Sequence, residues 1–126
     1  MSTKLPAAIP QVPVRDLARS IDYYRSRLGF SLDWEYEDGL AGVSCGETRL
    51  FLDRVVDGPV HPVRIWLNFC SNPEVDALHA RWKELGATIS SPPEQKPWNL
   101  YEFTAQDCDG NSLRVFHDTG TPAKEA

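Results

Sequence analysis

Apolar residues in an early segment of the chain recur at the spacing of one helical face. This apolar stripe consists of Leu17, Ile21, Tyr24 and Leu28. Its intervals of four, three and four residues are typical of an amphipathic helix. Asp16 precedes the stripe and is a residue type that caps helix N-termini, whereas Gly29 follows it and suits the left-handed conformation at which helices stop. The pattern predicts a first helix between these two residues.

A second stripe with the same character predicts a second helix. It consists of Val75, Leu78, Trp82 and Leu85, and Gly86 follows it. Asn72 is the expected N-cap, with Pro73 in the first turn, where the missing N–H leaves no hydrogen bond unmade. Because both helices end in Leu-Gly and these endings lie nearly half the chain apart, the sequence indicates an internal duplication.

The rest of the chain is typical of β-strands separated by turns. The expected strands are residues 9–14, 30–36, 40–45, 48–53, 63–69, 88–90, 100–105 and 112–116. Turns are expected at Asp38-Gly39, at Cys45-Gly46-Glu47 and at Asp107-Cys108-Asp109-Gly110-Asn111. Residues 91–97 contain three prolines and are predicted to form a loop.

The element order predicts an α+β fold made of two βαβββ modules. The first module would span residues 9–57 and the second residues 63–117, within a single domain of residues 1–126. Together the modules would form a curved mixed sheet with a concave cleft. The first four residues and residues 121–126 are expected to be frayed ends.

Composition and charge exclude several classes of function. Thirteen Lys and Arg residues against 18 Asp and Glu give a net charge of −5, which argues against nucleic-acid binding. No stretch is apolar enough to cross a bilayer, and the N-terminus lacks the apolar core of a secretory signal. Three cysteines without a CxxC motif predict neither a disulfide framework nor a zinc knuckle. We therefore expect a cytoplasmic protein with free thiols.

Period-2 alternation sorts each strand into a face toward a helix and a concave face. In the last strand, Leu113 and Val115 are assigned to the helix side, as are Leu50 and Leu52 in the strand that starts at Thr48. The concave face would then carry Arg49, Phe51, Asp53, Arg64, Trp66, Asn68, Ser112, Arg114 and Phe116. Aromatic side chains with a few polar groups between them suit a planar ligand.

Several local motifs resemble the vicinal-oxygen-chelate superfamily, which includes glyoxalase I, ring-cleaving dioxygenases and the bleomycin-resistance proteins. The motifs are Val14-Arg15-Asp16-Leu17, Tyr23-Tyr24, Leu28-Gly29-Phe30 and the turn from Asp107 to Asn111, where Cys108 replaces the usual proline. The stretches Glu37 to Val43, Leu50-Phe51-Leu52, Pro97-Trp98 and Glu102-Phe103 resemble the bleomycin-resistance branch in particular. These matches span residues 9 to 117.

The metal-dependent members of this superfamily take His, Gln or Glu ligands from four inner strands. By strand position the corresponding residues here are Ile9, a residue near Phe51, Arg64 and Arg114. Arginine keeps its proton and cannot donate a lone pair to a metal ion. His61, His79 and His117 are expected to face solvent and do not supply the missing ligands. The sequence therefore predicts no metal and no other cofactor, and it disfavours the glyoxalase and dioxygenase chemistries.

The resemblance also implies a drug-stacking role for Trp98. In the resistance proteins this tryptophan, together with an aromatic residue of the partner subunit, stacks on the drug. This chain has Leu40 at the second aromatic position, with Trp34 and Tyr36 close enough to compensate. Arg49, Arg64 and Arg114 would repel a cationic drug unless Asp53, Glu102 or Asp33 pairs with them, and they could instead select an anionic ligand.

Three functions remain open. The first is a non-catalytic protein that sequesters a bleomycin-type glycopeptide in clefts at a homodimer interface. The second is an enzyme of the same fold that acts on a small anionic metabolite. The third is a structural or regulatory dimer without a small ligand. For a ligand-binding protein the predicted site is Trp34, Tyr36, Phe51, Asp53, Arg64, Trp66, Asn68, Trp98, Glu102, Arg114 and Phe116.

Overall fold

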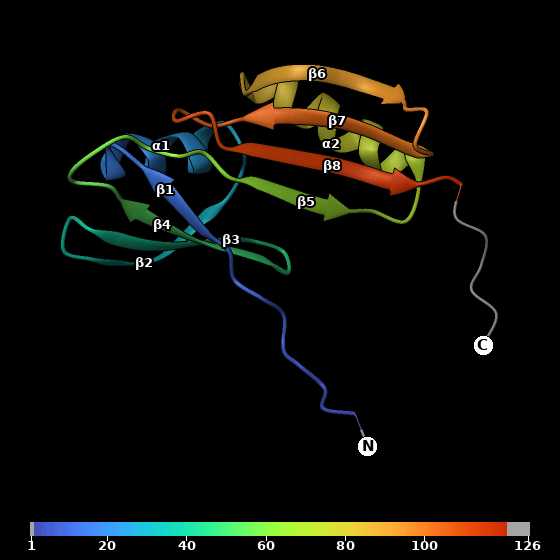
Figure 1. Cartoon of the computed structure of the whole chain (residues 1–126). Coiled ribbons are helices and arrows are strands. Elements are labelled where there is room, and N and C mark those ends of the chain that lie inside the picture. Colours follow the sequence, from blue (N-terminus) through green and yellow to red (C-terminus); the bar gives the residue numbers. More distant parts are fainter. Residues whose placement is uncertain (1, 121–126) are drawn as a thin grey trace.

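The computed structural model of the chain describes residues 2–120 and consists of two helices and eight strands in the repeated order βαβββ (Figure 1). The first repeat contains β1 (Gln11–Val14), α1 (Leu17–Ser26), β2 (Ser31–Tyr36), β3 (Leu40–Cys45) and β4 (Thr48–Arg54). The second contains β5 (Arg64–Asn68), α2 (Asn72–Leu85), β6 (Thr88–Gln95), β7 (Leu100–Gln106) and β8 (Ser112–Asp118). The C-terminal end that was expected to fray, residues 121–126, lies outside the described residues.

The strands form two four-stranded sheets of identical topology. The N-terminal sheet has the order β1-β4-β3-β2 and the C-terminal sheet the order β5-β8-β7-β6. In each sheet the first strand pairs in parallel with the last and the other pairs are antiparallel. The predicted α+β class with two βαβββ modules is therefore confirmed, and the matching strand orders agree with the duplication that the two helices indicated.

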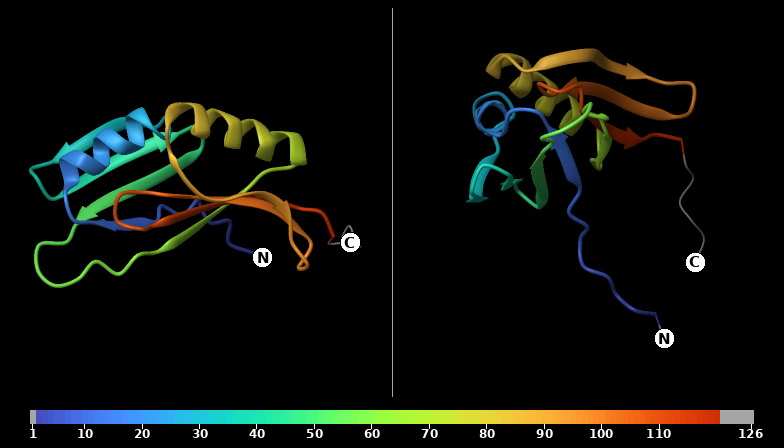
Figure 2. Two further views of the ribbon diagram at one scale, coloured as in Figure 1. Left: turned by 90° about the horizontal axis from the view of Figure 1, so that it is seen from above. Right: turned by 60° about the vertical axis from the view of Figure 1, so that its left-hand side comes forward.

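Each helix covers one face of its own sheet, and both helices lie on the same side of the molecule (Figure 2). α1 begins as predicted, because the Asp16 carboxylate accepts a hydrogen bond of 3.1 Å from the backbone N–H of Arg19. Its stripe of Leu17, Ile21, Tyr24 and Leu28 is buried in the core. Among residues 2–120, no helix lies on the opposite face of either sheet, and we call this face the open face.

The N-cap of α2 was assigned wrongly from the sequence. The cap is Ser71, whose hydroxyl accepts from the backbone N–H of Glu74, and Asn72 is the first residue of the helix. Ser71 and Asn72 are both good capping residues. The capping box that Ser71 forms with Glu74, whose carboxylate accepts from the Ser71 hydroxyl and the Cys70 N–H, favours the earlier start. The helix ends as predicted at Gly86, which adopts a left-handed conformation.

Among the strand boundaries that differ from the prediction, two bear on the candidate site. The proline-rich segment is not a loop, because β6 continues from Thr88 to Gln95. Proline has no N–H for a ladder hydrogen bond, but β6 lies at the edge of its sheet and the two prolines fall where its register with β7 shifts, between Ser91 and Glu94. Ile9 precedes β1, which begins at Gln11, so the first strand does not carry Ile9 at the position expected for a metal ligand.

The turn between β7 and β8 joins the two modules. The buried Asn111 amide donates to the carbonyl of Pro13 in β1, at 2.8 Å, and its oxygen accepts from the N–H of Val63, just before β5. The buried Asp107 carboxylate accepts hydrogen bonds from the hydroxyl of Tyr24 in α1 and from the backbone N–H and side-chain amide of Asn111. This clamp fixes how the two sheets sit relative to one another.

Candidate functional site

The predicted division into a helix-facing and an open side is confirmed for β4, β5 and β8. Leu50, Leu52, Ile65, Leu113 and Val115 are buried in the core beneath the helices. Trp66 and Trp98 are 46% and 55% exposed, which are large values for tryptophans, and Tyr36 is 66% exposed. Since large aromatic side chains are seldom left in water without a role, the open faces are the first place to look for a binding site.

On the C-terminal sheet, a buried carboxylate connects three of the predicted site residues. Glu102 on β7 is only 1% exposed. One of its oxygens, Oε1, accepts a hydrogen bond of 2.7 Å from the indole N–H of Trp98. The other oxygen lies 3.0 Å from a guanidinium nitrogen of Arg114 on β8. The charge-assisted hydrogen bond holds the Trp98 indole in place. The contact with Arg114 is an ion pair, since within residues 2–120 this second oxygen of Glu102 makes no hydrogen bond.

Arg114 in turn contacts the aromatic residues of the neighbouring strands. Its guanidinium carbon lies 4.6 Å from the centre of the Trp66 ring, and Trp66 meets Phe116 edge to face with ring centres 5.5 Å apart. The strand register explains this arrangement, because Trp66 pairs with Arg114 and Glu102 pairs with Phe116. The open face of the C-terminal sheet therefore presents a surface of aromatic rings around an arginine whose charge is paired.

The open face of the N-terminal sheet has its own aromatic pair. Trp34 on β2 and Phe51 on β4 meet edge to face with ring centres 5.1 Å apart, and Trp34 is 36% exposed. Asp53, two residues after Phe51, accepts a hydrogen bond of 2.7 Å from the side chain of Gln11 on β1. Gln11 was not among the predicted site residues, because a single exposed glutamine at the start of a strand carries no distinctive signal.

The remaining polar residues of the predicted site are exposed on β5. Arg64 pairs with Ser112 in the strand ladder, and Asn68 pairs with Phe116. Within residues 2–120, Arg64 and Arg49 form no salt bridge, whereas Arg114 forms one with Glu102. Of the three arginines expected on the concave face, one is thus neutralised by a buried partner and two remain able to attract an anion.

The residues at the expected metal positions do not fit a metal ion. Arg64 and Arg114 stand on β5 and β8, and neither guanidinium can donate a lone pair. In the described part of the chain, no three His, Cys, Asp or Glu side chains come together in a way that could hold a metal ion. Residues 2–120 thus supply no ligand set at the expected positions.

The expectation that all three histidines face solvent holds only for His61. His79 is partly buried because its ring packs against Phe103, with the ring centres 5.2 Å apart. His117 is partly buried as well, because its Nδ1 lies 2.8 Å from the side-chain oxygen of Asn72 in α2. His117 thus points to the helix side of the sheet, as the alternation of β8 predicted.

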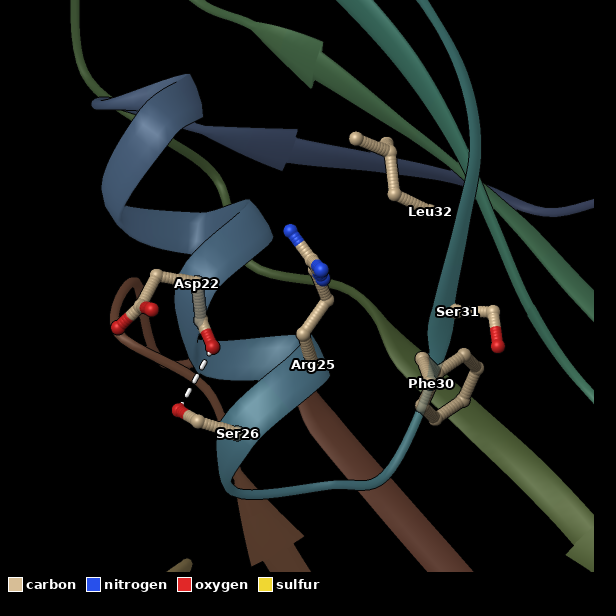
Figure 3. Close-up of a pocket in the computed structure, with 6 residues that line it drawn as sticks. All are labelled: Asp22, Arg25, Ser26, Phe30, Ser31 and Leu32. Atoms are coloured by element: carbon tan, nitrogen blue, oxygen red, sulfur yellow. Dashed lines mark hydrogen bonds between the residues drawn. The ribbon is translucent and has the colours of Figure 1, made fainter.

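Two hollows lie beside the helices. One is a groove of about 740 Å³ between the C-terminal half of α1 and the start of β2, where the Arg25 side chain extends across the gap (Figure 3). Its polar residues, Asp22, Arg25 and Ser26, were not predicted as site residues. The other measures about 610 Å³ and lies where the β3–β4 turn meets β5 and α2, next to Trp66 and Trp82. The second hollow is lined by two of the predicted site residues, Trp66 and Asn68, whereas the first is lined by none of them.

Comparison with known proteins points to one family. Residues 7–115 match the model of the Glyoxalase/Bleomycin resistance protein/Dioxygenase superfamily. A bleomycin resistance protein of Geobacillus stearothermophilus is 44% identical, with the match covering 86% of this chain and 94% of that protein. The bleomycin resistance protein of Staphylococcus aureus strain MRSA252 matches to the same extent.

Solved structures share the same fold. A glyoxalase/bleomycin resistance protein/dioxygenase from Nocardioides superimposes with a TM-score of 0.76 at 20% identity, covering 99% of this chain and 92% of that one. The bleomycin-binding protein of Streptomyces verticillus, solved as a complex with copper(II)-bleomycin, gives 0.73 at 23% identity, covering 90% and 97%. At these identities the likeness concerns the fold alone.

Proposed function

This chain belongs to the glyoxalase/bleomycin resistance protein/dioxygenase superfamily, and we propose that it is a non-catalytic protein that sequesters a bleomycin-type glycopeptide. The similarity to bleomycin resistance proteins supports this function, because it covers most of both chains at 44% identity. The chemistry of the open faces supports it as well, since they combine exposed aromatic rings with polar groups between them.

The observation that carries the proposal is the way in which Trp98 is held. An indole that is 55% exposed gains little from packing, yet its N–H is fixed by a carboxylate that is almost completely buried. A tryptophan that is held in place in this manner loses little further conformational freedom when a flat ligand stacks on it. We assign Trp98 and Trp66, which are linked through Glu102 and Arg114, as aromatic contacts of the bound drug.

We further propose that the binding clefts form between two copies of the chain. Each sheet is only four strands wide, and its aromatic residues lie on a face that no helix covers. A second copy placed against the open faces would bury these rings around a ligand, and homodimers are the commonest oligomers.

A cytoplasmic location is part of the proposal. Three free, exposed cysteines are consistent with the reducing conditions of that compartment. In residues 2–120 no helix has the length and apolar character needed to span a membrane.

One observation favours the second candidate, an enzyme that acts on a small anionic metabolite. Arg64 and Arg49 are exposed and form no salt bridge within residues 2–120, so they add positive charge to the surface. Positive charge would weaken the binding of a cationic drug and strengthen that of a carboxylate or phosphate. The pairing of Arg114 with Glu102 reduces the positive charge that a ligand would meet on the open face, but it does not remove that charge.

The Trp98→Ala variant tests the proposed function. Loss of the stacked indole should weaken bleomycin binding by about tenfold, which corresponds to about 1.4 kcal/mol. The urea denaturation midpoint should change little, since Trp98 is more than half exposed. Val56→Ala, which removes another exposed apolar side chain outside the open faces, is the matched control. Unchanged binding in Trp98→Ala would remove this residue from the site and, with it, the main support for drug sequestration.

Sedimentation equilibrium tests the proposed dimer. The expected result at micromolar concentration is twice the 14.2 kDa mass of one chain. A stable monomer that still binds the drug would contradict a site at a dimer interface.

A further inference from the structure

The helix side of β5 is less completely covered than the corresponding side of β1. The two strands hold the same place in their sheets, since each lies at an edge and pairs in parallel with the last strand of its module. Val12 and Val14 on β1 are fully buried, whereas Leu67 on β5 and Phe69 just after it are only partly buried. The second module therefore leaves apolar surface uncovered where the first module covers it.

This surface lines the hollow of about 610 Å³ that lies where the β3–β4 turn meets β5 and α2. The apolar wall of the hollow comes from both modules and consists of Phe30, Leu67, Phe69, Leu78 and Trp82. Phe30 and Trp82 are 5% and 3% exposed, and the Trp82 indole N–H donates to the carbonyl of Leu28 at 2.9 Å, so this part of the wall is fixed. Cavities of about 300–1,000 Å³ are typical of small-molecule sites.

The turn between β3 and β4 forms one side of the hollow. Cys45 pairs with Thr48, which leaves Gly46 and Glu47 as a two-residue turn. Gly46 has a φ of 58°, and Glu47 is not among the residues with positive φ, as expected for the hairpin turn that places glycine first. Because so short a turn has little conformational freedom, it holds Glu47 and Cys45 at the hollow.

The polar residues at the hollow have no partners in the protein. Among the described residues that line it, Glu47 alone carries a charge at neutral pH. Within residues 2–120 the Glu47 carboxylate makes no salt bridge, and the side chains of Thr48 and Asn68 make no hydrogen bond. An apolar wall beside one unpaired carboxylate is complementary to an apolar molecule that carries a single positive charge.

We propose that this hollow is a second binding site, which takes a small molecule with an apolar body and a protonated amine. The body packs against Phe30, Leu78 and Trp82, and the ammonium group pairs with Glu47. The site goes beyond drug sequestration and does not depend on it. Trp66 lies at the hollow and also contacts Arg114 on the open face, so the two sites are neighbours.

Cys45 reports directly on occupation of the hollow, because it lines the hollow and its thiol is free and exposed. The probe is 1-naphthylmethylamine, and the measurement is the rate at which iodoacetamide alkylates each cysteine, followed by peptide mass spectrometry. At a probe concentration of about ten times the dissociation constant found by calorimetry, alkylation of Cys45 should slow about tenfold. The exposed Cys108, in the β7–β8 turn, is the internal control and should react at an unchanged rate. An unchanged or faster reaction at Cys45 would overturn the site.

The Glu47→Gln variant tests the class of ligand. It should weaken binding of the amine by about threefold at low salt, since an exposed charge pair contributes modestly. Binding of the neutral analogue 1-naphthylmethanol should be unchanged. The matched control is Glu37→Gln, which removes the same charge from an exposed residue just before the other end of β3. Equal affinity of the wild-type protein for the amine and the alcohol, with no effect of Glu47→Gln, would overturn the preference for a cation.

The inference and the proposed function can fail separately. Saturable binding of the amine with slower alkylation of Cys45 supports the hollow as a site whether or not bleomycin binds. Absence of amine binding to a wild-type protein that does bind bleomycin would refute the hollow as a site and leave drug sequestration standing.

Discussion

Replacement of Glu102 by alanine should destabilise the protein and release two side chains of the candidate site. The Glu102 side chain is 1% exposed, and its removal leaves the Arg114 guanidinium, which is 24% exposed, without its counter-charge. Breaking a fully buried ion pair costs about 3–5 kcal/mol. Because Arg114 is partly solvated and the freed Trp98 N–H can bond to water, we expect a loss of about 2–3 kcal/mol in the free energy of unfolding.

A double-mutant cycle measured by urea denaturation checks this magnitude. Glu102→Gln keeps an oxygen that can accept from the Trp98 N–H but removes the negative charge, so it should cost about 1–2 kcal/mol. Arg114→Met leaves the carboxylate buried without its partner and should be the more damaging single change. The double variant Glu102→Gln/Arg114→Met contains no unpaired charge and should be more stable than Arg114→Met alone.

The same variants link stability to binding. In Glu102→Gln the Trp98 ring stays in place but Arg114 becomes an unpaired cation on the open face, so binding of a cationic drug should weaken at low salt and recover as salt screens the charge. Two results together would refute the view that Glu102 holds the site together. Glu102→Ala would lower the free energy of unfolding by less than about 0.5 kcal/mol, and the effects of Glu102→Gln and Arg114→Met would add in the double variant.

Two further predictions concern the clamp between the modules. Asn111→Ala removes the hydrogen bond to Pro13 across the module boundary and the one to Val63 within the second module, and it should cost about 3 kcal/mol of stability by urea denaturation, since partly buried backbone groups lose their partners. A cost below about 1 kcal/mol would show that the clamp is not essential. Burial, together with the nearby charge and hydrogen bond of Asp107, raises the pKa of Tyr24 well above its ordinary value of 10.0. The folded protein then keeps a proton that the unfolded chain loses, so stability should fall as pH rises above about 10. Tyr24→Phe should reduce this fall, and an unchanged pH dependence would contradict the assignment.

The helices and the faces of the regular strands could be predicted because local patterns determine them. Leu113 and Val115 alternate with Arg114 along β8, and the buried face of a sheet tolerates no polar residue without a partner, so the sequence identifies the core side. The cap of α2 was placed one residue late, because Ser71 and Asn72 are both good capping residues and only the hydrogen bond distinguishes them.

The parts that could not be predicted depend on neighbours that are distant in sequence. The prolines at positions 92 and 93 suggested a loop. β6 nevertheless continues through them, because it lies at the edge of its sheet, where a strand tolerates residues without a backbone N–H. The face of Trp34 depends on a β-bulge at Asp33, which strict alternation cannot reveal. The sequence offered three possible partners for the concave-face arginines, and only the pairing of β7 with β8 selects Glu102 for Arg114.

The direct test of the account is calorimetric titration of metal-free bleomycin into the wild-type protein, with the oligomeric state measured in the same buffer. The account predicts saturable binding of one drug molecule per chain, hence two per dimer, without turnover of the drug. Absence of saturable binding, or a chemically altered drug recovered after incubation, would contradict the claim that this protein acts by sequestering a bleomycin-type ligand.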